Sequence, residues 1–343
     1  MSADFGYINA RVRGLKSRLL GPEFYNQALA DTGGFDSFIA MLSQTDYMTD
    51  LEEAQSRSHG LAAVDDALAR NFWRLTRQIL KITDGWPHRL VAMLLMKYDL
   101  ANVKAIVRAK HAGRSAEDAA SALLPAGQLK PAVLESMAQA ADVAGVAQVL
   151  SAAGHPLAAD VRAAARTYQE DNDLFGFELA VDRAYTRALV AISEELPLPD
   201  KFRQWIVLQV DATNVRTALK LRGRPLPDAD LFINPDLKLQ FRRSAFDVLI
   251  ADEGGEGLAQ LADGPFARVA AADSLGAADS IIRDVLDDRI GMTAVGDPLG
   301  PFVVLDYLRR KEREVARLRL LARGKFYSVP RAQLETELGS GNA

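Results

Sequence analysis

Cysteine is entirely absent from this 343-residue chain. Its absence excludes disulfide bonds and thiolate metal sites, and it fits a cytosolic protein. Long apolar runs are lacking too: the longest strictly apolar stretch, residues 90–96, is far shorter than the ~20 residues that a membrane-spanning helix needs. We therefore expect a soluble protein without a direct membrane span.

Familiar catalytic motifs are also missing. No two of the four histidines have the three- or four-residue spacing of zinc ligands on one helix. The chain has neither a P-loop nor a Gly-x-Ser-x-Gly motif. We predict no catalytic residue, no metal and no cofactor. One alternative is a Mg²⁺ cluster at Asp284, Asp287 and Asp288. No second acidic motif accompanies it, so the favoured interpretation is a solvated acidic face.

Basic charge is not in excess, because 41 Lys and Arg stand against 45 Asp and Glu, for a formal net charge of −4. This balance argues against a nucleic-acid-binding protein. Alternating runs of β-branched residues, which are typical of strands, are nearly absent, whereas alanine is frequent. The hydrophobic fraction of 49% is ordinary for a folded chain. The composition predicts an all-α fold.

One helical segment occurs more than once. Residues 98–110 and 210–223 share, in register, an apolar residue, Asp, two further residues, Asn, Val and a basic residue. Looser copies stand near the chain ends, at 7–13 and 313–318. The spacing of the copies is much longer than one solenoid unit. The repeat therefore predicts three similar helical subdomains.

Proline and glycine delimit the repeated helices. Proline marks their starts, where its missing N–H costs nothing, and Gly113, Gly223 and Gly324 fall where a left-handed C-terminal cap is expected. The boundaries that we predict are a first subdomain at 1–58, completed by 277–328, a second at 59–172, a third at 173–276, and a polar C-terminal tail at 329–343.

Asn102 and Asn214 are expected within helices, where asparagine is a mediocre helix former. We expect each amide to bond a neighbouring helix or loop carbonyl and to fix the packing of its own subdomain. Lining of a cavity is the alternative. Asp99 and Asp211, one turn earlier, could hold a Lys or Arg from an adjoining helix. We interpret all four as structural residues of the repeat.

Two basic helices are candidate partner-binding surfaces. The helix expected over residues 4–20 carries basic residues that include Arg11 and Arg13, and the strongly charged segment 307–327 adds a second set: Arg309, Arg310, Arg313 and Arg317. A solvated, salt-bridged helix face explains both patterns. Docking to a partner or to an anionic membrane edge is the alternative.

Several of these segments together resemble a known family. Residues 5–13, 99–102, 210–220 and 311–323, in this order, resemble the C subunit of bacterial and archaeal V/A-type ATP synthases, the counterpart of the d subunit of eukaryotic V-ATPases. The resemblance covers about residues 1–335. Its strength lies in the order of the segments and in the threefold repeat, since no single motif is diagnostic.

The resemblance implies a non-catalytic, all-helical funnel of three similar subdomains in a pseudo-threefold arrangement, without cofactor. It implies a peripheral place at the cytoplasmic face of the cell membrane and two partners. The funnel would receive the central shaft, subunits D and F, and would sit on the membrane proteolipid (c/L) ring, so that both rotate together during proton or sodium transport and ATP synthesis or hydrolysis. The residues alone would also suit a generic helical scaffold.

Overall fold

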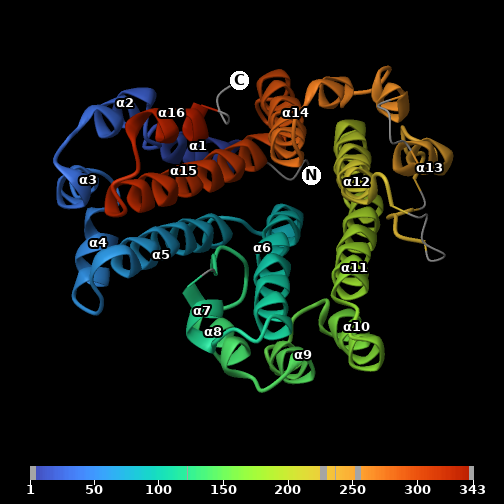
Figure 1. Ribbon diagram of the computed structural model, residues 1–343, viewed down its shortest axis with the longest axis horizontal. Helices are drawn as coiled ribbons and strands as arrows, with labels where there is room; N and C mark the ends of the chain where they lie inside the picture. The colour runs from blue at the N-terminus through green and yellow to red at the C-terminus, as the bar shows by residue number, and fades with distance from the viewer. Residues whose placement is uncertain (1–4, 122, 225–229, 236, 252–255, 340–343) are drawn as a thin grey trace. The chain divides into compact units, whose positions relative to one another are not determined.

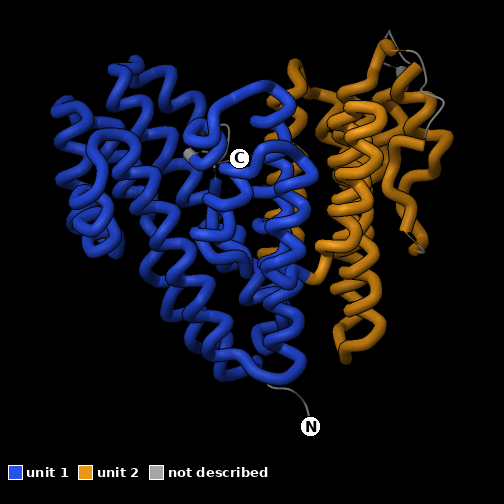
Figure 2. Tube along the Cα trace, turned by 90° about the horizontal axis from the view of Figure 1, so that it is seen from below, with its two compact units in different colours: residues 1–155, 294–343 blue, residues 156–293 orange. Residues whose placement is uncertain are grey.

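The computed structural model describes residues 5–121, 123–224, 230–235, 237–251 and 256–339. Over these ranges it contains sixteen α-helices, two short 3-10 helices and no strand, which confirms the all-α prediction (Figure 1). The chain forms two compact units (Figure 2). Unit 1 comprises residues 1–155 and 294–343, and unit 2 comprises residues 156–293. The division into three subdomains stays a prediction.

Unit 1 combines the two ends of the chain. Its central helix is α15 (Phe302–Phe326), which packs against α1, α3, α5 and α16. The apolar residues of α15 recur at helical spacing and are buried against these neighbours. The other helices of the unit are α1 (Phe5–Lys16), α2 (Pro22–Ala30), α3 (Gly34–Leu42), α4 (Met48–Gln55), α5 (Gly60–Lys81), α6 (Gly85–His111), α7 (Ala116–Ser121), α8 (Pro131–Gln139), α9 (Val143–Ala152) and α16 (Arg331–Gly339).

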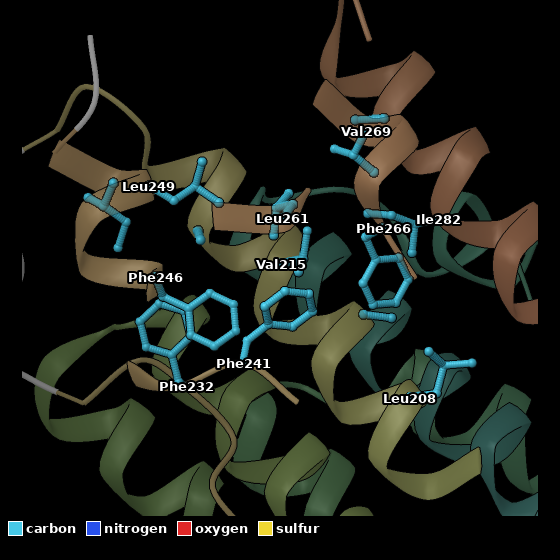
Figure 3. Packing of buried hydrophobic residues seen from close by; sticks show 14 of the residues in the cluster. Leu208, Val215, Phe232, Phe241, Phe246, Leu249, Leu261, Phe266, Val269 and Ile282 are labelled. Atoms are coloured by element: carbon cyan, nitrogen blue, oxygen red, sulfur yellow. The ribbon is translucent and has the colours of Figure 1, made fainter. Parts of the chain in front are cut away.

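Unit 2 is built on two long helices, α11 (Leu174–Glu195) and α12 (Asp200–Leu221), which pack against each other. Phenylalanine rings attach the later segments to α12 in one apolar cluster (Figure 3). Within it, Phe232 and Phe246 stack at 4.8 Å between ring centroids. The remaining elements are α10 (Ala158–Asp171), α13 (Arg243–Ala251), η1 (Glu256–Leu261), η2 (Ala267–Ala271) and α14 (Leu275–Gly296), whose last turn enters unit 1.

The predicted glycine caps are confirmed at two of three positions. Gly113 and Gly223 follow α6 and α12 with φ of 65° and 71°, a left-handed backbone that glycine adopts without steric cost. The prediction for Gly324 is wrong, because α15 continues through it to Phe326. Gly324 is buried where α16 crosses, and a Cβ there would overlap the side chain of Leu334.

The expected polar tail at 329–343 contains α16. This helix packs against α15 and α2 and buries Leu334 and Leu338. Its apolar residues are too few to give a clear helical stripe in the sequence, so the contact with Gly324 is visible only in the fold.

Candidate functional site

The first copy of the repeat ties a loop to α6. The Nδ2 of Asn102 donates to the carbonyl of Leu124 at 2.8 Å, and its Oδ1 accepts the N–H of the same residue at 2.9 Å. The Asp99 carboxylate accepts the N–H groups of Gln128 and Leu129 at 2.7 and 3.0 Å. Two side chains one helical turn apart therefore satisfy both ends of this loop.

The second copy makes the same bonds from α12. Asn214 exchanges two hydrogen bonds of 2.8 Å with the backbone of Ile233. Asp211 accepts the N–H of Gln240 at 3.1 Å, and the sequence separation of 29 residues equals that between Asp99 and Gln128. The four residues thus serve as matching loop anchors in units 1 and 2.

The two aspartates bond backbone amides of their loops, and a basic residue of an adjoining helix, Arg77 on α5, interacts with the charge of Asp99. Asp99 and Asp211 are fully buried, and a buried carboxylate needs hydrogen-bond donors close by, which the loop backbone supplies. The guanidinium of Arg77 donates to the carbonyl of Gly127. Burial lowers the pKa of Arg77, although Asp99 favours its charged form. Burial raises the pKa of Asp211 to about 6, although the backbone N–H groups of Gln240 and Phe241 act in the opposite direction.

A charged version of the anchor stands on α15, in the loose C-terminal copy. Glu314 occupies the position of the asparagine and accepts the N–H of Leu20 at 2.6 Å. It also pairs with Lys311 at 2.7 Å and accepts the hydroxyl of Tyr47 at 2.7 Å. Burial lowers the pKa of Lys311, although Glu314 favours its charged form. Burial, and to a lesser extent the negative charge of Glu314, raises the pKa of Tyr47. Helix α15 therefore holds the N-terminal segment through a buried polar cluster.

The arginines predicted to bind partners fall into two groups. Arg309 pairs with Glu312 at 3.3 Å, Arg310 with Asp306 at 2.9 Å, and Arg317 lies 5.5 Å from the Tyr25 ring centroid, all within unit 1. Arg313 is half-buried on the same helix. Arg11 and Arg13 are exposed on α1, and Arg13 donates to the carbonyl of Pro298 at 2.7 Å.

Glu312 connects α15 to α6. It accepts hydrogen bonds from Lys97 at 2.7 Å and Tyr98 at 3.1 Å. Burial alone would raise the pKa of this carboxyl, but the Lys97 and Arg309 cations and these hydrogen bonds lower it to about 2. Much of the basic charge of α15 is thus matched inside unit 1.

The charge pattern of the sequence does not predict the cluster of Lys311, Glu314 and Tyr47. Charged residues in a strongly charged helix are typical of an exposed face, so burial was not expected there. The usable signal was the alignment of Glu314 with Asn102 and Asn214, which placed it at a loop anchor.

The acidic positions of α14 do not converge. Asp284 is buried whereas Asp288 is exposed, and no metal-binding group of three or more His, Asp or Glu occurs in the described ranges. Within the same ranges, no helix has the length and apolar character to cross a membrane.

Comparison with known proteins identifies a family for almost the whole chain. The family described as "ATP synthase (C/AC39) subunit" matches residues 8–337. The C subunit of the V-type ATP synthase of Deinococcus radiodurans is 34% identical over 98% of this chain and 92% of its own length. The V-type C subunit of Thermus thermophilus is 35% identical over 98% of this chain and 99% of its own length. The A-type C subunit of Haloferax volcanii is 29% identical over 97% of this chain and 96% of its own length. The chain belongs to the C-subunit family of V/A-type ATP synthases.

Proposed function

We propose that this chain is a non-catalytic member of the central stalk that couples the shaft of a rotary ATP synthase to its membrane ring. The observation that carries the proposal is family membership over residues 8–337, with relatives covered along nearly their whole length. In this role the chain receives the tip of subunits D and F and sits on the proteolipid ring at the cytoplasmic face. It transmits torque and performs no chemistry.

Rigid loops suit such a role. A subunit that transmits torque does so less efficiently if its loops deform under load. In this chain, buried side chains fix loops that follow long helices. Asn102 and Asn214 each make two hydrogen bonds to one backbone residue. We assign partner contact first to Arg11 and Arg13, which are exposed on α1, and then to the arginines of α15.

We also propose the three-subdomain organisation, with 1–58 completed by 277–328, then 59–172 and 173–276, in a pseudo-threefold funnel. Three equivalent anchors support it: Glu314, Asn102 and Asn214 accept the N–H groups of Leu20, Leu124 and Ile233. Because the first anchor joins the two ends of the chain, it matches a subdomain assembled from both ends.

Binding of the purified chain to its two partners tests the function. The D–F shaft and the proteolipid ring are presented separately, at low and at high salt. We expect binding to both, with affinity falling at high salt for the contact that depends on charge. A folded chain that binds neither partner would favour the generic scaffold.

A further inference from the structure

The anchored loop of unit 2 is longer than its counterpart in unit 1. In unit 1 the anchored N–H groups belong to Leu124 and Gln128, which are four residues apart, whereas in unit 2 they belong to Ile233 and Gln240, which are seven residues apart. The shorter loop is closed by an arginine of α5, which donates to two of its carbonyls. The same pair of anchors therefore spans a wider loop in unit 2.

The wider loop and α13 enclose a cavity of about 370 Å³. Its apolar walls include Leu237 and Leu239 of the loop and the rings of Phe232 and Phe246, which stack in the cluster of Figure 3. The two leucines are only half-buried, so they retain apolar surface that the chain itself does not cover. A cavity of this size with mostly apolar walls is typical of small-molecule sites.

The charged residues around this cavity leave one cation without a partner. Asp230 is held by two arginines, Arg243 at 2.5 Å and Arg183 at 3.3 Å. Arg243 also lies over the ring of Phe232, at 4.5 Å from its centroid. Arg242 is exposed and lines the cavity, and within the described ranges its guanidinium has neither a hydrogen-bond nor an ion-pair partner. The cavity therefore combines apolar walls with one available planar cation.

The chemistry of these groups selects an apolar ligand with a negative charge. A guanidinium suits a carboxylate, which can accept two parallel hydrogen bonds from it. Aromatic rings attract other rings beyond the apolar area that they bury. Asp230 is already paired with arginines, so it neither offsets the charge of Arg242 nor attracts a cationic ligand. We propose that this cavity binds a small aromatic carboxylic acid, with the ring between Phe232 and the two leucines and the carboxylate on Arg242.

Titration of the purified full-length chain with 3-phenylpropionate tests the proposal. We expect a Kd of about 1 mM or tighter, which is ordinary for a ligand of this size. The affinity should fall as salt rises, because Arg242 is exposed. The neutral amide of the same acid should bind about fivefold more weakly, and the corresponding amine more weakly still.

Arg242→Gln separates the role of the cation from that of the apolar walls. It should lower the affinity for the acid about fivefold and leave the affinity for the amide unchanged, because only the acid interacts with the charge. Arg166→Gln is the matched control, since Arg166 is an exposed arginine of the same unit, on α10 and outside the cavity lining. It should change neither affinity.

Asn234→Trp tests the location. Asn234 is exposed and lines the cavity, and its side chain has no partner in the part of the chain that the structure describes, so a larger side chain fills the cavity without breaking a bond. It should weaken the binding of acid and amide alike by about tenfold or more. Bound acid should also slow amide exchange over residues 237–246 and leave residues 123–129, the shorter loop of unit 1, unchanged.

Three results would overturn the proposal: no binding at about 10 mM acid, equal affinities of the unmodified chain for acid and amide, or an equal loss of both in Arg242→Gln. Slower exchange confined to other segments would overturn it as well. If Asn234→Trp lowers the melting midpoint, Arg242→Gln and the exchange pattern decide. These outcomes are independent of the proposed function, since neither the shaft nor the membrane ring takes part.

Discussion

Asp99 and Asp211 are equivalent residues in two copies of one sequence motif, but the groups that surround their carboxylates differ. The carboxylate of Asp99 receives two backbone N–H groups at 2.7 and 3.0 Å, and Nε2 of His155 lies 3.7 Å from it. Asp211 receives the N–H groups of Gln240, at 3.1 Å, and of Phe241, and burial raises its pKa to about 6. Identical residues at identical helical positions thus have different surroundings, because the groups that face them come from other segments of the chain.

The raised pKa of Asp211 predicts a pH-dependent stability. Between about pH 4 and pH 6 the folded state binds a proton at Asp211 that the unfolded state has released. The stabilisation from this proton is therefore fully present below the unfolded pKa of 3.8 and is lost as the pH rises through about 6. We expect the free energy of unfolding of the unmodified chain, relative to Asp211→Asn, to fall by about 2–3 kcal/mol from pH 4 to pH 7. Chemical denaturation at both pH values measures it; a pH-independent difference would contradict it.

At the scale of elements, helices α15 and α16 depend on one small residue. Gly324 lies inside α15, where glycine costs about 1 kcal/mol relative to alanine. The side chain of Leu334 occupies the space that a Cβ would need, so the glycine allows α16 to lie directly on α15. The sequence suggested that Gly324 ends a helix, but the structure shows that glycine is needed there because α16 crosses α15 at this position.

Gly324→Val should displace α16. We expect a loss of about 1–3 kcal/mol of stability from overpacking and faster amide exchange over residues 331–339. Gly14→Val is the control, because a Cβ at Gly14, inside the exposed face of α1, meets no atom within 4 Å. Hydrogen exchange of both variants gives the measurement; unchanged protection of α16 in Gly324→Val would refute the packing argument.

At the scale of the whole molecule, the two chain ends form one unit through a buried charge pair. Lys311 and Glu314 are 3% and 5% exposed and hold Tyr47 and the backbone of Leu20. Hydrophobic contacts alone would hold α15 against the N-terminal helices in many registers. Hydrogen bonds to a particular backbone N–H select one of them.

Neutralising one member of this pair should be costly. Glu314→Gln leaves the Lys311 ammonium buried without its counter-charge, and we expect a loss of about 3–5 kcal/mol. The double variant Lys311→Met with Glu314→Gln removes that charge as well, so it should be more stable than Glu314→Gln alone. Denaturant titration of the unmodified chain, the single variants Glu314→Gln and Lys311→Met, and the double variant tests the coupling, and strictly additive losses would count against it.

Local patterns account for what was predictable. Helical periodicity and the scarcity of strand-type runs predicted an all-α fold, and glycines after apolar helices predicted the caps at Gly113 and Gly223. These features depend on interactions within a few residues along the chain. The family was accessible in the same way, because its signature is an ordered set of local segments.

The sequence by itself therefore determined the helices, the repeated Asp–Asn positions and the family. Tertiary structure alone decided which loops Asp99 and Asp211 hold, that Gly324 lies under a helix crossing, and that Lys311 and Glu314 are buried. The physical reason is distance along the chain. Periodicity fixes which side of a helix is apolar, but the partner of a buried polar group is chosen by packing between segments tens to hundreds of residues apart.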